Sequence, residues 1–302
     1  MIMIRKLCRI ITRAIQINPF IPAVLFRHYS HKAAMQGVDG LYLILSFDCD
    51  TDRDIEVVSH VADILNNMDV KAVYAVPGRL IERGARVYQG LLEADNEFIN
   101  HGYREHTVFE NGQYVSTLFY DKFDEAEIVE DICKGDKVLR DVLGIAPRGF
   151  RVPHFGTFQS RQYLAFLHQV LKDMSYLYSS STVPLYAFRY GPIHDAGGLY
   201  EIPVSGCYDM PTTILDSYSF CLAQKSGMMK QDYVIQFKKM VDFFSKHDLP
   251  GVLNYYADPS QVYNFDGFYE AVSYAVDKGA KNTTYCNLLA SRINGRFGRL
   301  SS

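Results

Sequence analysis

Short apolar runs alternate with longer segments of helical spacing along this chain, and this alternation most constrains the fold. Residues 41–47 and 251–256 are apolar runs with the length of buried strands. Residues 54–67 and 125–143 instead place apolar side chains three to four positions apart, as amphipathic helices do. Regular alternation of strands and helices predicts a parallel sheet covered by helices. The number of repeats predicts an α/β fold, a single distorted (β/α) barrel of about seven βα units.

The remaining elements follow from the same patterns. Further strands are predicted at residues 70–76, 97–100, 149–152, 175–178 and 199–204. Further helices are predicted at residues 85–94, 161–172, 233–246, 268–277 and 284–294. Residues 191–198 and 208–229 are expected to be loop insertions.

Composition limits the class of protein. The chain has 302 residues, of which 48% are hydrophobic and 22% charged, as in globular proteins with a substantial core. No linker-like segment divides it, so residues 39–302 are expected to form one domain. A net charge of -3 gives no electrostatic basis for binding nucleic acid. The cysteines lack C-x-x-C spacing, which argues against a disulfide framework and indicates a reducing compartment: Cys8, Cys49, Cys133, Cys207, Cys221 and Cys286.

Residues 1–38 form a basic and apolar N-terminal extension. Its longest uncharged stretch is too short and too interrupted by proline for a spanning helix or a typical signal peptide. We expect this amphipathic segment to pack on the domain or to lie on an anionic membrane surface, with packing slightly favoured. The protein is expected to be cytoplasmic, and contact with the inner membrane surface is the alternative to packing of this segment on the domain.

Acidic residues follow the strand at residues 41–47. Asp48 and Asp50 are two positions apart, so both leave the strand on the same side. In α/β folds, ligands and catalytic groups gather at this edge of the sheet. One carboxylate can hold a cation there while the other acts as a base. An isolated D-x-D pair would more often be a solvated loop.

Two later segments offer partners for these acids. His101 and His106 follow the strand at residues 97–100, and two imidazoles with one carboxylate can bind Zn, Fe, Ni or Co. On spacing alone, a strand cap and an exposed loop histidine are an equally good interpretation. Arg151 lies near the end of the strand predicted at residues 149–152 and can form bidentate hydrogen bonds to a carboxylate.

Taken in order, these segments resemble the NodB-type polysaccharide deacetylases, a family of metal-dependent carbohydrate esterases, over residues 41–292. Ser46-Phe47-Asp48-Cys49-Asp50 is similar to the family's first motif, which implies Asp48 as general base and Asp50 as metal ligand. The second motif is similar to residues 101–106, and the third to residues 151–156, which implies that Arg151 holds Asp48. The resemblance implies a distorted barrel with one divalent metal, usually Zn²⁺, with Co²⁺, Ni²⁺ or Fe²⁺ as alternatives.

The sequence departs from the family pattern at two places. The family's histidines are usually four positions apart, and here that position holds Glu105, with His106 next. Either residue could be the third ligand; we favour His106, because imidazole suits zinc beside one carboxylate. The last motif normally supplies an acid histidine, but residues 255–259 contain none. Asp258 at this position could pair with another residue, or His154 could supply the acid. Otherwise Asp48 itself would have to make both proton transfers.

The resulting expectation is a metal-dependent hydrolase that removes an N-acetyl or similar N-acyl group from a sugar. Its substrate would be a glycan or glycan precursor. Three alternatives stay open: an amidase of the same fold that acts on a small amide, an inactive barrel that only binds glycans, and a structural subunit without metal.

Overall fold

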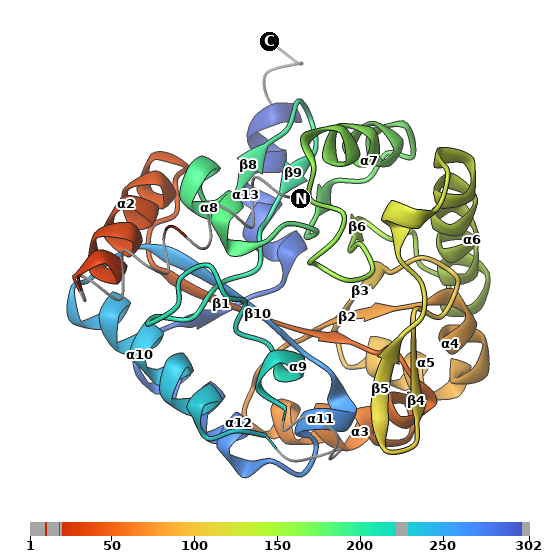
Figure 1. Ribbon diagram of the computed structural model, residues 1–302, viewed down its shortest axis with the longest axis horizontal. Helices are drawn as coiled ribbons and strands as arrows, with labels where there is room; N and C mark the ends of the chain where they lie inside the picture. Colours follow the sequence, from red (N-terminus) through yellow and green to blue (C-terminus); the bar gives the residue numbers. More distant parts are fainter. Residues whose placement is uncertain (1–9, 11–17, 19, 222–228, 298–302) are drawn as a thin grey trace.

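The computed structural model describes residues 10, 18, 20–221 and 229–297. At its centre lies a curled sheet with the strand order β10-β1-β2-β3-β6-β7-β9-β8, and β11 pairs with β1 (Figure 1). All of these strands pair in parallel except β8, which is antiparallel to β9. The strands are β1 (Leu41–Asp48), β2 (Val73–Val76), β3 (Glu97–Asn100), β6 (Gly149–Phe150), β7 (Tyr178–Ser179), β8 (His194–Asp195), β9 (Tyr200–Glu201), β10 (Gly251–Ala257) and β11 (Lys281–Asn282). This arrangement confirms the predicted α/β distorted barrel.

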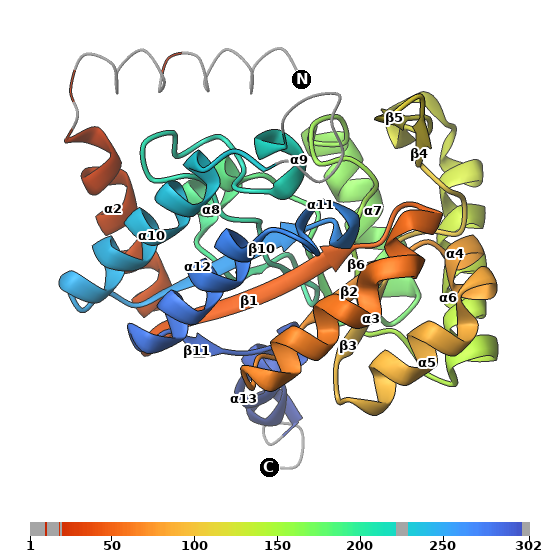
Figure 2. The same cartoon turned by 90° about the horizontal axis from the view of Figure 1, so that it is seen from below.

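Helices surround the sheet (Figures 1 and 2). They are α2 (Ile21–Met35), α3 (Asp52–Asn67), α4 (Gly78–Arg83), α5 (Ala85–Glu93), α6 (Glu125–Leu143), α7 (Arg161–Asp173), α8 (Pro184–Tyr190), α9 (Ser217–Phe220), α10 (Asp232–Lys246), α11 (Pro259–Val262), α12 (Asp266–Asp277) and α13 (Tyr285–Phe297). A 3-10 helix, η1 (Tyr120–Lys122), precedes α6. A separate hairpin of β4 (Thr107–Glu110) and β5 (Gln113–Ser116) follows β3.

Most elements have a clear local cause. Strand β1 is buried along nearly its whole length, because its side chains join hydrophobic clusters on both faces of the sheet. Thr51 and Asp54 form a capping box at the start of α3, and Asp124 and Glu127 form another at α6. Helix α6 ends at Gly144, whose positive φ of 71° suits a glycine in a helix C-cap.

The sheet does not close through a regular ladder. Strand β10 instead meets the segment after β9, where Ser205 N–H donates to the Asn254 carbonyl (2.8 Å) and Asn254 N–H donates to Ser205 Oγ (2.9 Å). Next to this contact, the Tyr29 hydroxyl of α2 donates to the Val252 carbonyl (2.6 Å) and accepts from Val252 N–H (3.1 Å). A side chain of α2 therefore satisfies a backbone edge that no neighbouring strand covers.

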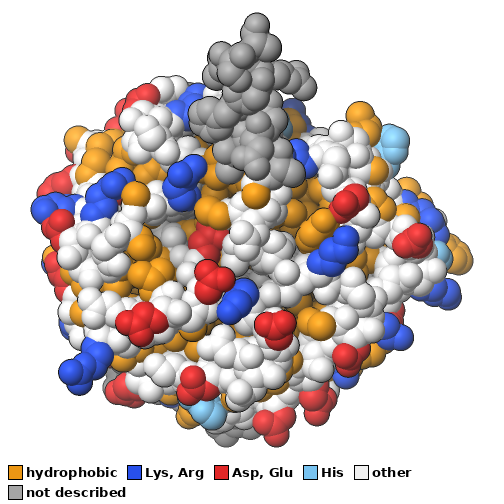
Figure 3. Space-filling model, turned by 180° about the vertical axis from the view of Figure 1, so that it is seen from behind, with side chains coloured by type: hydrophobic (Ala, Val, Ile, Leu, Met, Phe, Trp, Pro, Cys, Tyr) orange, Lys and Arg blue, Asp and Glu red, His pale blue; other side chains and the backbone are white. Residues whose placement is uncertain are grey.

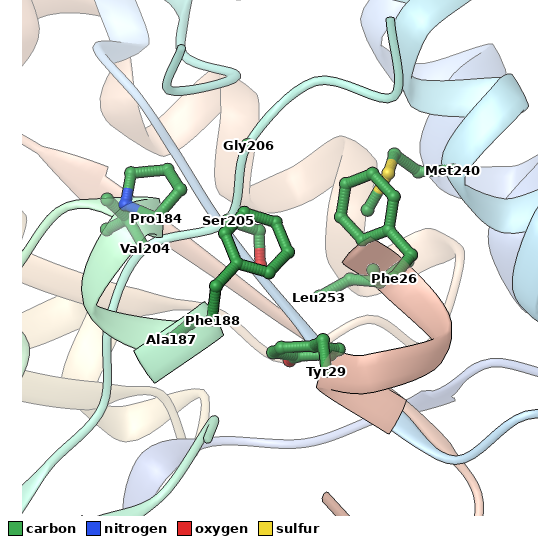
Figure 4. Close-up of a pocket in the computed structure, with 10 residues that line it drawn as sticks. All are labelled: Phe26, Tyr29, Pro184, Ala187, Phe188, Val204, Ser205, Gly206, Met240 and Leu253. Carbon is green, nitrogen blue, oxygen red and sulfur yellow. The ribbon is translucent and has the colours of Figure 1, made fainter. Parts of the chain in front are cut away.

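Aromatic side chains fill the gap beneath this contact (Figure 4). Phe26 and Tyr29 of α2 pack against Phe188 of α8, with ring centroids 5.4 and 6.3 Å from that of Phe188. The cavity left among them holds about 10 Å³, which is room for one water molecule at most. This pocket is therefore a small packing defect where α2 and α8 close the barrel, and it is too small to bind a ligand.

The structure corrects the predicted elements in a few places. The strand predicted at residues 175–178 is Tyr178–Ser179, because Ser175 has a positive φ of 63° that interrupts extended backbone. Residues 191–198, predicted as a loop, contain the edge strand β8. The predicted insertion at residues 208–229 includes the short helix α9, and residues 222–228 lie outside the described residues. The β4–β5 hairpin and α8 were not predicted.

The predicted N-terminal extension is described from residue 20 onward, apart from residues 10 and 18. There it forms α2, which packs on β10 and α8 through buried residues such as Phe26 and Tyr29. The domain division at residue 38 and the contact with a membrane stay predictions. Among the described helices, none is long and apolar enough to cross a membrane.

We expect Tyr29→Phe to lower the free energy of unfolding by about 1–3 kcal/mol, because it leaves the Val252 N–H without its partner in the described chain. Urea denaturation would measure the change. Tyr163→Phe is the matched control, since that partly exposed ring stacks on Phe158 and its hydroxyl makes no hydrogen bond to a described residue. Equal stability of the two variants would show that the Tyr29 hydroxyl does not help to close the barrel.

Candidate metal centre

The predicted site residues come from neighbouring strands and meet at the carboxyl edge of the sheet. Asp48 ends β1, and Asp50 lies in the loop that leads to α3. His101 follows β3, His106 directly precedes β4, and Arg151 follows β6. Because β1, β2, β3 and β6 are consecutive in the sheet, their ends lie side by side.

Three of these residues form a group that could hold a metal ion. Asp50, His101 and His106 each offer a ligand atom, and these atoms all lie within 4.8 Å of one another. His106 Nε2 is 2.9 Å and His101 Nε2 is 3.5 Å from Asp50 Oδ1. Burial would raise the pKa of Asp50, but the imidazoles of His106 and His101 hold it well below its usual value.

The polar atoms of this group fit a cation. Asp50 Oδ1 and both ring nitrogens of His106 are buried and have no well-aligned hydrogen bond within the described part of the chain. His101 Nδ1 lies 2.8 Å from the Arg151 carbonyl, which can accept its proton and leave the Nε2 lone pair toward Asp50. A carboxylate oxygen and two imidazole nitrogens are the donor set that zinc and similar divalent metals accept. The residues present therefore fit the metal that the sequence predicted.

The loop geometry distinguishes His106 from Glu105. The Glu105 carboxylate binds Arg83, which also contacts Asp52, so Glu105 is held by another partner. Gly102 has a positive φ of 78°, and a Cβ at this position would lie 2.3 Å from Asp131 Oδ2. This tight turn accounts for the extra residue between the two histidines.

Asp131 of α6 supports the histidine loop. Its carboxylate accepts from the Arg104 N–H (2.9 Å) and from the Tyr120 hydroxyl (2.7 Å), and it is buried. No sequence motif marked Asp131, because the contact joins a helix to a loop 27 residues away.

Asp48 pairs with Arg151, as the sequence predicted. Arg151 Nη1 donates to Asp48 Oδ1, and both side chains are buried. Arg151 Nη2 also donates to the Tyr285 hydroxyl (2.7 Å), which donates to Asn254 Oδ1 (2.7 Å). Ser180 contributes its carbonyl (3.4 Å from Arg151 Nε) and its hydroxyl. This network fixes the orientation of the guanidinium and thereby of Asp48.

Two aromatic rings cover the same ion pair. Phe155 and Tyr256 lie with centroids 4.9 Å apart, at 5.4 and 5.5 Å from the Arg151 guanidinium carbon. Contacts of this kind add cation–π attraction to the buried Arg151 guanidinium.

Asp54 positions the backbone of the acidic loop and was not among the predicted site residues. Its Oδ2 accepts from Asp50 N–H (3.0 Å), Thr51 N–H (2.9 Å) and the Thr51 hydroxyl (2.8 Å), while Oδ1 accepts from Ser260 N–H (2.9 Å). Burial raises the pKa of Asp54 to about 6. The T-x-x-D spacing of a capping box was the signal that could have identified it.

His154 lies beside the candidate ligands but does not belong to the group. Its ring is 5.2 Å from that of His106 and 4.8 Å from that of Phe119. His154 Nε2 lies 3.0 Å from the His106 carbonyl oxygen and can donate to it as a neutral imidazole. Burial lowers the pKa of His154 to about 4, and the neighbouring His106 adds to the shift.

Asp258 lies at the end of β10, next to Asp48. Phe47 of β1 pairs with Ala257 of β10 in register, so the two aspartates that follow occupy adjacent positions. The Asp258 N–H donates to Ser217 Oγ (2.8 Å), but its buried carboxyl group makes no hydrogen bond to a described residue. Burial raises the pKa of Asp258 well above its usual value, and the neighbouring carboxylates add to the shift.

The site thus offers three chemical capabilities. Asp50, His101 and His106 can hold a cation, and Asp48 is an oriented carboxylate beside it. Asp258 is a buried carboxyl group available for a proton or a cationic group. Cys49, also within the acidic motif, is fully buried, and burial raises its pKa well above its usual value, so it is a core residue.

A polysaccharide deacetylase family model matches residues 37–176. The matched range contains the segments with Asp48, Asp50, the two histidines and Arg151, but it ends before β10 and Asp258. A comparison with curated proteins found no match.

Several solved structures have a similar fold. One is a protein from Mycobacterium smegmatis provisionally assigned as a polysaccharide deacetylase (TM-score 0.63, 16% identity, 85% of this chain and 92% of that chain covered). Another is the allantoinase PuuE (TM-score 0.57, 13% identity, 81% and 87% covered). A third is a CE4 family pseudoenzyme from Bacillus anthracis (TM-score 0.52, 14% identity, 83% and 66% covered). At these identities the similarity shows the fold alone.

We expect His106→Gln to lower the affinity for Zn²⁺ by about 10–100-fold or more, because it removes an imidazole from the candidate ligand group. Glu105→Gln should leave the affinity unchanged, since its carboxylate faces Arg83. Competition with a chromophoric chelator would measure both. A larger loss of Zn²⁺ affinity in Glu105→Gln than in His106→Gln would identify Glu105 as the ligand.

Proposed function

Because this chain belongs to the polysaccharide deacetylase family through residues 37–176, we propose that it is a metal-dependent hydrolase that removes an N-acyl group, most simply N-acetyl, from an amino sugar. The observation that carries the proposal is the combination of Asp50, His101 and His106 with the oriented Asp48 at one strand edge. A metal held by those three residues would supply Lewis acidity toward the amide carbonyl and the attacking water.

The chain's own residues would provide the proton transfers and the orientation. Asp48 is placed to take a proton from the attacking water, because one of its oxygens is bound by Arg151 and the other lies 3.9 Å from His101 Nε2. Arg151 keeps the Asp48 rotamer fixed through its own buried network. The aromatic pair Phe155 and Tyr256 would shield the Arg151 guanidinium from water and so preserve its contact with the base.

We propose Asp258 as the group that protonates the leaving amine. Asp258 follows the residue that pairs with Phe47, so it lies next to Asp48 in the sheet. No described residue donates a hydrogen bond to its carboxyl group. His154 is the weaker candidate, because its Nε2 is directed at the His106 carbonyl. Two carboxyl groups in different surroundings can divide acid and base roles between them.

The similar folds leave two other functions open to experiment. The allantoinase shows that this fold accommodates a small-amide substrate in another protein, and the pseudoenzyme shows that it can occur without activity. We favour an active deacetylase here, because the ligand group and the Asp48–Arg151 pair are assembled together.

We expect the Zn²⁺-loaded protein to release acetate from N-acetylglucosamine oligomers, and Asp48→Asn to reduce kcat by about 10²–10⁴-fold, because the base is lost while the ligand group remains. An enzymatic acetate assay would measure release, and metal analysis would check that Zn²⁺ is retained. Circular dichroism should accompany this variant, since it leaves Arg151 buried without its charge partner.

Asp52→Asn is the matched control, because Asp52 is exposed and contacts Arg83. Turnover of allantoin or another small amide without acetate release from glycans would instead identify an amidase. A Zn²⁺-bound protein that binds the oligomers but turns over no amide would be an inactive glycan-binding barrel.

We expect Asp258→Asn to reduce kcat/KM for the acetamido substrate by about 100-fold and to leave hydrolysis of para-nitrophenyl acetate near the wild-type rate. The amide needs a protonated leaving group, whereas nitrophenolate leaves without one. His154→Gln is the control for the other candidate donor. Equal losses on both substrates would mean that Asp258 supports the structure of the site and is not the proton donor. A loss on the amide alone, seen only in His154→Gln, would assign proton donation to His154.

A further inference from the structure

Charge is distributed very unevenly along this chain. Residues 1–38 contain no Asp or Glu and carry six basic residues, Arg5, Lys6, Arg9, Arg13, Arg27 and Lys32. Residues 39–302 hold the other 25 Lys and Arg against all 34 Asp and Glu, a net charge of -9. A positively charged segment on an otherwise acidic protein favours an anionic partner for that segment alone.

The described part of this segment exposes apolar side chains next to the basic ones. Phe20, Val24 and Met35 are 74%, 63% and 75% exposed. Their spacing places them on one face of α2 together with the exposed Arg27 and with His28 and His31. The other face is buried against the barrel through residues such as Phe26 and Tyr29. Helix α2 is therefore apolar on its packed face and both apolar and basic on its outer face.

The start of α2 lies on the side of the molecule that carries the site loops. Figure 2 shows this end of α2 on the same side as α9 and the β4–β5 hairpin, with α13 on the opposite side. The segment between β9 and α9 packs on α2, where the Tyr208 ring stacks on Phe26 at 5.8 Å. Met210 in this segment and Tyr218 in α9 are 42% and 54% exposed. On the opposite face, basic and acidic side chains are interspersed (Figure 3).

We propose that the outer face of α2, which exposes Arg27 beside its apolar side chains, docks on the surface of an anionic lipid bilayer. Mixed apolar and basic side chains favour a bilayer over nucleic acid, because exposed Phe and Val gain from the acyl region while Arg pairs with lipid phosphate. The contact is peripheral, since no described helix can span a membrane. Phe20 and Val24 lie at the start of α2, so a bilayer that meets them lies near the side of the molecule that carries the site loops.

This orientation also names the substrate class. If the proposed deacetylase activity holds, the substrate is an N-acylated glycan carried on a membrane lipid. That extension rests on the proposed function, whereas the docking itself does not.

The test is co-sedimentation of the full chain with vesicles, which requires no activity. We expect binding to vesicles of equal parts phosphatidylglycerol and phosphatidylcholine, weak binding to phosphatidylcholine alone, and weaker binding as salt is raised. Phe20→Ser/Val24→Ser should lower the bound-to-free ratio by about tenfold, because two exposed apolar side chains are lost. Arg27→Gln should lower it further on anionic vesicles only.

Ile235→Ser/Val276→Ser is the matched control, because these exposed apolar residues lie on α10 and α12 and should not affect binding. No binding to anionic vesicles, or equal loss in the two double variants, would overturn the docking face. Binding to duplex DNA but not to vesicles would also overturn it and make the basic segment a nucleic-acid contact. Acetate release from a soluble oligomer, unchanged in Phe20→Ser/Val24→Ser, reports separately on the proposed function.

Discussion

The buried ion pair between Arg151 and Asp48 is the interaction on which the rest of the site depends. Arg151 is fully buried, and its contacts join β1, the segment after β7, and the start of α13. Removing one member of such a pair leaves the other charge uncompensated and costs about 3–5 kcal/mol. The pair therefore links the orientation of the proposed base to the stability of the barrel.

Negative charge is concentrated around this pair. Five buried or partly buried carboxyl groups face the same edge of the sheet: Asp48, Asp50, Asp54, Asp216 and Asp258. Burial raises the pKa values of Asp54 and Asp216 to about 6, and that of Asp258 well above its usual value. This edge is therefore costly to keep fully ionised, and a divalent cation at Asp50 would reduce that cost. The concentration of negative charge and the set of donor atoms therefore both favour a divalent cation at this site.

Much of the fold followed from local sequence patterns. The apolar run of β1, the spacing of α6 and the βα alternation are determined over short distances, so periodicity predicted them. The two-residue strands β6 and β7 are set by their neighbours in the sheet, so their bounds were less accurate. The Tyr29 contact with Val252 joins residues 223 positions apart and has no local signal.

The same distinction applies to the site. Asp48, Asp50, His101 and Arg151 lie in recognisable motifs, whereas Asp131 and Tyr285 support them from other elements. The choice of His106 over Glu105 as the third metal ligand depends on the turn at Gly102 and on the position of Arg83. Residue spacing along the sequence does not give either of these.

The register of β1 and β10 indicates which group would take the place of an acid histidine after β10 in the proposed reaction. Parallel pairing of Phe47 with Ala257 places whichever residue follows Ala257 next to Asp48. That residue is Asp258, a carboxyl group without a hydrogen-bond partner among the described residues, while Asp48 has Arg151. Burial raises the pKa of Asp258 well above its usual value, which suits a proton donor, while Arg151 holds the Asp48 carboxylate in place. The position after Ala257 would then determine which residue donates the proton, whether that residue is a histidine or an aspartate.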